Sequence, residues 1–327
     1  GGGVMHNDWT AKPFHLPEHL HFTNWVVTEG LRFLQQRDPT RPFFLTLQFV
    51  APHPPLQPPA FYMERYLRTG VPDPVIGDWA GSPPVLGEEW DWVAPNRVHL
   101  TGEAMCSARA AYYGLINHVD DQLRRILNGI TGVDSITRHN TIVIFTSDHG
   151  EMLGDHYMWR KCRAYEASAR VPFMVRAPER FKLKRTHVVD AVATHADIMP
   201  TLLDMADVDI PKTVDGASLW PFMRGEKPRK WRQCLHIEHS PWHQALTDGR
   251  EKFIWWPESG REQFFDVTAD PQDTHDLIGD PAWQKRIAGW RKELVRRLAR
   301  RPEGFVRNGR LVPGRPYGAV MPGTHGR

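Results

Sequence analysis

Apolar side chains recur along this chain at two spacings, one typical of helices and one typical of buried strands. In residues 23–34 and 112–126 they recur mostly every three or four positions, which predicts two helices that each bury one face in a core. Residues 43–50 and 142–145 are apolar at nearly every position, which predicts strands covered on both faces. This alternation predicts an α/β domain in which helices flank a mostly parallel sheet.

The last third of the chain has a different pattern. Residues 234–239 and 252–256 predict strands of a small antiparallel sheet. Residues 283–300 predict a helix whose apolar positions, such as Ile287 and Leu294, pack across that sheet. The sequence therefore predicts a smaller C-terminal α+β domain.

These patterns divide the chain into three parts. We expect the large α/β domain over residues 1–225 and the small subdomain over residues 226–302. Residues 303–327 are rich in Gly, Pro and Arg, and we expect them to form a basic tail without order of its own. Within the large domain, residues 70–99 are rich in Pro, Gly and Trp with little periodicity, which predicts a long surface loop.

Composition excludes some classes of protein. Lysine plus arginine exceeds aspartate plus glutamate by 41 − 38 = 3, too small an excess to indicate a nucleic-acid partner. No run of about 18 apolar residues is present, so we expect no membrane span. The three cysteines lack CxxC spacing and predict neither a disulfide framework nor a zinc site. No signal peptide is visible at the start, and nothing in the sequence specifies a compartment or an oligomeric state.

Candidate chemistry is concentrated where predicted strands end. Asp148 and His149 come just after strand 142–145, and His53 follows strand 43–50. Side chains converge at the carboxyl ends of strands in open α/β sheets, so these positions suit a binding site. A carboxylate beside an imidazole supplies two ligands from one turn, which indicates a metal site at Asp148 and His149.

Further motifs follow in a fixed order. The chain carries Ser147-Asp148-His149-Gly150, then Gly154-Asp155-His156, then Lys161 before Tyr165-Glu166, and then Arg170-Val171-Pro172 before a strand. The other blocks are Arg41-Pro42-Phe43-Phe44 to Ala51-Pro52-His53-Pro54-Pro55, Asp197-Ile198-Met199-Pro200-Thr201, Asp215-Gly216-Ala217-Ser218-Leu219 and Phe264-Phe265-Asp266-Val267. From about residue 20 to about residue 280, this series resembles the sulfatase family of the alkaline phosphatase superfamily.

The resemblance implies a role for each of five residues. Asp148 and His149 match the family's ligands for a divalent cation, usually Ca²⁺. Lys161 matches the lysine that neutralises a sulfate oxygen, and His53 matches the histidine that contacts the sulfate and can protonate the leaving group. His156 matches a position that either holds the metal loop or contacts the substrate, and the sequence leaves that choice open.

The family's nucleophile has no counterpart in this sequence. It is a cysteine in C-x-P-S-R that is converted to formylglycine, whereas Cys106 has Ala108 at the proline position and Ala110 at the arginine position. The family's N-terminal paired aspartates and its G-K-W-H stretch are also missing. We therefore expect an N-terminally truncated sulfatase, inactive alone, whose formylglycine belongs to the missing segment. A catalytically dead metal-binding relative is the alternative.

The resemblance also implies a substrate class for the intact protein. It is a small-molecule or carbohydrate sulfate ester, hydrolysed with the help of the divalent cation. A phosphonate monoester or phosphodiester hydrolase is the second alternative, because such enzymes of the same superfamily share the Asp–His metal pair. The sequence does not specify which ester is bound.

Overall fold

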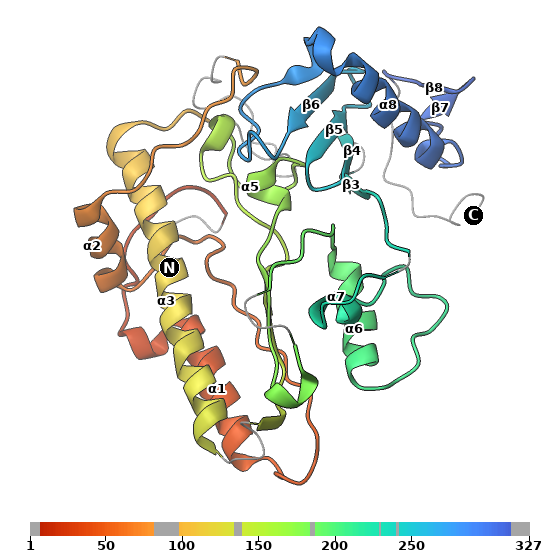
Figure 1. Cartoon of the computed structure of the whole chain (residues 1–327). Coiled ribbons are helices and arrows are strands. Elements are labelled where there is room, and N and C mark those ends of the chain that lie inside the picture. Colours follow the sequence, from red (N-terminus) through yellow and green to blue (C-terminus); the bar gives the residue numbers. More distant parts are fainter. Residues whose placement is uncertain are drawn as a thin grey trace, which may run out of the picture.

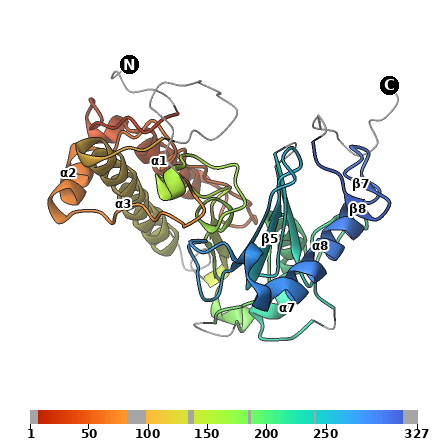
Figure 2. The same cartoon turned by 90° about the horizontal axis from the view of Figure 1, so that it is seen from above.

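The structure is a computed structural model that describes residues 7–81, 98–133, 139–183, 187–228, 230–239 and 242–314. Long helices form one side of the molecule, and extended segments run through its middle (Figure 1). An antiparallel sheet with one helix on its outer face forms the other side, as Figure 2 shows from above. The candidate site residues lie on the segments between these two sides.

Three helices build the N-terminal side: α1 (Phe22–Gln36), α2 (Ala60–Thr69) and α3 (Gly102–Val133). The longest of them, α3, contacts both others. The helices predicted over residues 23–34 and 112–126 are confirmed as α1 and as part of α3. Among the described residues, no helix is long and apolar enough to cross a membrane.

The middle of the molecule contains two short strands, β1 (Val143–Thr146) and β2 (Phe173–Arg176), which pair antiparallel. The prediction of a strand at 142–145 is confirmed by β1, although its four residues are half-buried and not fully covered. The prediction that residues 43–50 form a strand covered on both faces is wrong, since this segment belongs to no sheet of the described chain and Phe44 is 79% exposed. Only its other face, including Leu47, packs against the helices.

The predicted α/β class is confirmed, with one difference in the sheet. All pairs of named strands in the described residues are antiparallel, whereas the sequence predicted a mostly parallel sheet. The physical reason is local. Residues 43–50 form no strand in the described chain, so the strand that they were predicted to add to the sheet is absent and β1 pairs only with β2 there.

The C-terminal sheet has the strand order β3 (Leu235–His239), β4 (His243–Thr247), β5 (Glu251–Trp255) and β6 (Glu262–Asp266). Each strand pairs antiparallel with the next, and α8 (Gln284–Leu298) packs on one face. The predicted antiparallel sheet with its helix is therefore confirmed. Side chains alternate along each strand, so the sheet has a second face, which is turned toward the candidate site.

Residues 303–314 differ from the expected tail. Phe305 is fully buried in the core under α8, and β7 (Val306–Arg307) pairs with β8 (Arg310–Leu311) in a hairpin. The expectation of disorder is therefore wrong for these residues, because Phe305 contributes to the same hydrophobic core as the sheet. Residues 315–327, and the part of the predicted surface loop at 82–97, lie outside the described residues.

The described chain also contains short 3-10 helices and the short α-helices α5 (Glu166–Ala169), α6 (Ile198–Met205) and α7 (Trp220–Met223). The boundary expected near residue 225 stays a prediction. A buried ion pair crosses it, since the Arg232 guanidinium binds both carboxylate oxygens of Asp197.

Candidate active site

Asp148 and His149 lie in the turn that follows β1. The Asp148 side chain is 85% exposed, and its Oδ1 accepts a hydrogen bond from the His149 backbone N–H at 3.0 Å. His149 Nδ1 donates to the Gly150 carbonyl oxygen at 2.8 Å, which leaves the lone pair of Nε2 for another partner. His149 Nε2 and Asp148 Oδ2 are 3.6 Å apart. The turn therefore presents an imidazole nitrogen and a carboxylate side by side.

His53 and Lys161 come together although they are 108 positions apart in the chain. Lys161 Nζ lies 2.6 Å from His53 Nε2, and His53 Nδ1 donates to the Pro54 carbonyl oxygen at 2.7 Å. The His53 and His149 rings are 6.0 Å apart between centroids. Burial, and to a lesser degree the Lys161 charge, lower the pKa of His53, so its imidazole is neutral near pH 7. The structure thus brings together four of the five residues singled out from the sequence.

Lys161 lies in the segment of residues 151–165, which we call the lysine loop. Arg160 and Cys162, on either side of Lys161, have positive φ angles of 70° and 68°, an uncommon conformation for residues other than glycine. The Glu151 carboxylate stabilises this path by accepting hydrogen bonds from the backbone N–H groups of Arg160 and Leu153. Burial raises the pKa of Glu151. Such strained backbone persists only where surrounding contacts determine it.

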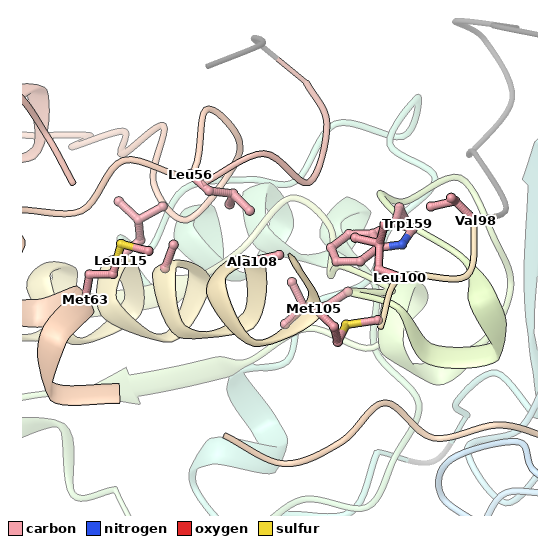
Figure 3. Close-up of a cluster of buried hydrophobic side chains, with 10 residues drawn as sticks. Leu56, Met63, Val98, Leu100, Met105, Ala108, Leu115 and Trp159 are labelled. Carbon is pink, nitrogen blue, oxygen red and sulfur yellow. The ribbon is translucent and has the colours of Figure 1, made fainter. Parts of the chain in front are cut away.

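Two aromatic side chains, one on each side of Lys161, anchor the lysine loop. Trp159 packs beside Leu100 and Met105 in the core along α3, as Figure 3 shows. On the other side, the Tyr165 ring stacks on Trp79 at 4.7 Å between centroids, and its hydroxyl donates to Gln263 Oε1 at 2.7 Å. The loop is therefore held between the helices and the inner face of the C-terminal sheet.

His156 lies within the lysine loop but away from solvent. It is 1% exposed, Nδ1 accepts from the Gly77 backbone N–H at 3.0 Å, and Nε2 donates to the Gln272 carbonyl oxygen at 3.0 Å. Both ring nitrogens are thus used by backbone groups of two distant segments. This geometry leaves no nitrogen for a substrate, so of the two roles left open for His156 it favours support of the loop.

A buried ion-pair cluster ties the end of the lysine loop to the sheet, and the sequence did not predict it. Lys252 on β5 is fully buried, with Nζ 2.9 Å from Glu166 Oε1 and 3.1 Å from Asp273 Oδ2. Asp273 also accepts a hydrogen bond from the Glu166 backbone N–H at 2.6 Å. Burial raises the pKa of Asp273, and the Lys252 charge opposes that rise. One signal was available, since Lys252 and Ile254 share the inward face of a predicted strand.

Asp148 and His149 are the residues predicted from the sequence to bind a cation. No group of three His, Cys, Asp or Glu side chains among the described residues is placed to hold a metal ion. A calcium ion takes about six to eight oxygen ligands, so Asp148 with His149 is an incomplete shell. The exposed carboxylate and the Nε2 lone pair are chemically suited to a divalent cation that has further ligands elsewhere.

Comparison with solved structures places the fold in a known class. The phosphonate monoester hydrolase of Agrobacterium radiobacter superposes with a TM-score of 0.72 at 24% identity, over 91% of this chain and 64% of that one. A protein whose structure was solved in complex with its substrate, D-glucosamine-2-N,6-O-disulfate, superposes with a TM-score of 0.71 at 22% identity, over 85% of this chain and 69% of that one. The chain therefore shares the fold of these two proteins.

The chain belongs to the sulfatase family. The sulfatase family model matches residues 4–208, and the model of the C-terminal part of N-sulphoglucosamine sulphohydrolase matches residues 154–300. An arylsulfatase of Clostridium perfringens is 40% identical over 322 residues, which is 97% of this chain and 66% of that protein. The resemblance inferred from the motifs is therefore confirmed.

Other curated relatives also extend beyond the matched region. The multifunctional alkaline phosphatase superfamily protein PehA of Trinickia caryophylli is 28% identical over 318 residues, covering 88% of this chain and 61% of that protein. The chain thus spans about two thirds, or somewhat less, of the length of these relatives.

Proposed function

We propose that this chain forms the larger part of a sulfuric ester hydrolase, with His53 and Lys161 binding the sulfate group. The observation that carries the proposal is the 2.6 Å contact between Lys161 Nζ and His53 Nε2, close to His149. A neutral imidazole beside an ammonium suits an anionic substrate, because the ammonium offsets the charge of a sulfate oxygen.

The hydrogen bonds indicate which atoms of His53 and Lys161 act on the sulfate ester. His53 Nδ1 is occupied by the Pro54 carbonyl, so Nε2 is the atom that faces the departing oxygen of the ester. Nε2 takes up a proton from solvent, passes it to that oxygen as the ester bond breaks, and is left neutral again. The Lys161 ammonium, held by the strained loop, binds a sulfate oxygen and lowers the energy of the transition state. A sulfate oxygen thereby replaces His53 as the partner of Lys161.

Two further groups complete the proposal. Asp148 and His149 would hold a divalent cation, most suitably Ca²⁺, which acts as a Lewis acid on the reacting oxygens. The nucleophile is proposed to be a formylglycine in a segment outside this sequence, because none of Cys106, Cys162 and Cys234 lies in a C-x-P-S-R motif. We call this chain together with that segment the complete enzyme, and we expect the chain alone to be inactive.

A second candidate is a phosphonate monoester or phosphodiester hydrolase. It is favoured by the likeness to the Agrobacterium enzyme and to the phosphonate monoester hydrolase of Silicibacter pomeroyi, which has a TM-score of 0.71 at 26% identity, over 91% of this chain and 67% of that one. Sulfate monoesters and phosphonate monoesters both present anionic oxygens to Lys161. The arrangement of His53 and Lys161 therefore suits either substrate.

Relative kcat/KM values for three matched substrates test the proposal. The complete enzyme is assayed on 4-nitrophenyl sulfate, 4-nitrophenyl phenylphosphonate and bis(4-nitrophenyl) phosphate, all of which release the same leaving group. We expect the sulfate to have the highest kcat/KM. A higher value for the phosphonate or the diester would favour the second candidate, and turnover of any of them by the chain alone would contradict the assignment of the nucleophile.

A further inference from the structure

A groove of about 490 Å³ lies at the outer side of the C-terminal subdomain, between α8 and the β7–β8 hairpin. One wall is a stripe of α8 with helical spacing, made of Ala288, Arg291, Lys292 and Val295. The facing wall is the hairpin, with Arg310 and Leu311. The volume is in the range of small-molecule sites, which span roughly 300–1,000 Å³.

The groove carries more positive than negative charge. Arg291 is neutralised, since its guanidinium binds both carboxylate oxygens of Glu262, with Nε to Oε1 at 2.7 Å. Lys292 and Arg310 are exposed, and neither forms an ion pair with any described residue. They belong to opposite walls, so an anion between the walls would be attracted by both.

The groove is separate from the candidate active site. Trp255 of β5 lines the groove and packs with α8, whereas its neighbour Ile254 packs with Tyr165 of the lysine loop. Successive strand residues point to opposite faces of a sheet. The sheet therefore stands between the groove and Lys161, and in Figure 2 α8, β7 and β8 lie on the side of β5 away from α3.

We propose that this groove is a second ligand site, which binds a small organic anion made of an apolar ring system with a sulfate or carboxylate group. The two unpaired cations account for the anionic group. Apolar wall residues such as Val295 and Leu311 account for the ring, because they offer contact area that a free inorganic ion cannot use. A sugar ring and an aromatic ring both present such apolar faces. This proposal does not rest on the proposed function.

The test measures binding rather than turnover. The chain with Lys161→Ala, which weakens anion binding at the candidate active site, is titrated by calorimetry with 2-naphthyl sulfate, with a sulfated disaccharide and with inorganic sulfate. We expect at least one of the two ring compounds to bind. Inorganic sulfate should bind at least about tenfold more weakly than that ring compound. The tighter ring compound identifies the ligand class. If neither ring compound binds, or if inorganic sulfate binds as tightly, the proposal is overturned.

Variants then locate the site. The double variant Lys292→Gln with Arg310→Gln should lower the affinity for the ring compound about tenfold or more, since each exposed charge contributes up to about 1 kcal/mol to binding. The matched control is Lys285→Gln with Arg307→Gln, which removes the same charges from the same helix and hairpin outside the groove. Ala288→Glu, at an exposed position, should abolish binding without a change in melting temperature. Equal affinities in the two double variants would refute the assignment to the groove.

Discussion

The lysine loop and the Asp148–His149 turn contribute to one candidate site, yet the fold holds them very differently. The loop is packed between α3 and the C-terminal sheet, and its anchors Trp159 and Tyr165 are buried. The Asp148 carboxylate is 85% exposed and hydrogen-bonds only the next residue among those described. Lys161 is therefore preorganised by folding, whereas the geometry of the turn depends on what binds there.

The largest effect is expected where the loop is tied to the sheet. Lys252→Met should lower the free energy of unfolding by about 4 kcal/mol, because it leaves Asp273 as a buried carboxylate without its cation and removes the buried partner of Glu166. Urea denaturation of the chain measures this loss. Lys285→Met is the control, because Lys285 is exposed on α8 and should change stability very little. Similar unfolding free energies for both variants would show that the cluster does not hold the loop.

Removing the charge that the loop presents should affect catalysis and not stability. Lys161→Ala in the complete enzyme should lower kcat/KM about a hundredfold, or about 3 kcal/mol of transition-state stabilisation, with an unchanged melting temperature. Lys161→Arg should restore activity only in part, because a guanidinium presents its donors in a different geometry. Lys212→Ala, at an exposed position, serves as the control. Nearly full activity of Lys161→Ala would remove Lys161 from the site.

A similarly small change in stability is expected at the exposed turn. Asp148→Ala should alter the free energy of unfolding by less than about 0.5 kcal/mol, as is usual for surface positions. In the complete enzyme the same change should abolish calcium binding and activity, since a methyl group cannot replace an oxygen ligand. Calcium titration by calorimetry and thermal denaturation measure the two effects, with Asp120→Ala as the surface control. An unchanged calcium stoichiometry would contradict the role of Asp148.

Local patterns predicted the elements that carry their own periodicity. The helical spacing predicted α1 and α8, the turn after β1 made Asp148 and His149 candidates, and the family resemblance added Lys161 as a candidate. The β7–β8 hairpin was missed even though Asn308-Gly309 is a strong two-residue turn signal and both residues have positive φ. The overall Gly, Pro and Arg content of the tail outweighed that local signal in the prediction.

Contacts between distant segments could not be predicted in the same way. The ion pairs of Lys252 with Glu166 and Asp273 depend on how the lysine loop packs on the sheet. The role of His156 depends on backbone groups of Gly77 and Gln272, which are 79 and 116 positions away. Single-sequence patterns report local spacing, whereas such contacts arise only after the chain has folded.

The extended segment at residues 43–50 has a consequence for handling the chain by itself. It contains no charged residue and no proline, it is rich in apolar side chains, and it exposes Phe44 and Val50 on one face. No strand of the described chain pairs with it, and of its backbone groups the Val50 carbonyl accepts a hydrogen bond from the His53 N–H. The edge of the segment is therefore available for hydrogen bonding with another chain. Such segments promote edge-to-edge aggregation. The isolated chain should therefore associate increasingly with concentration, through added strands at this segment.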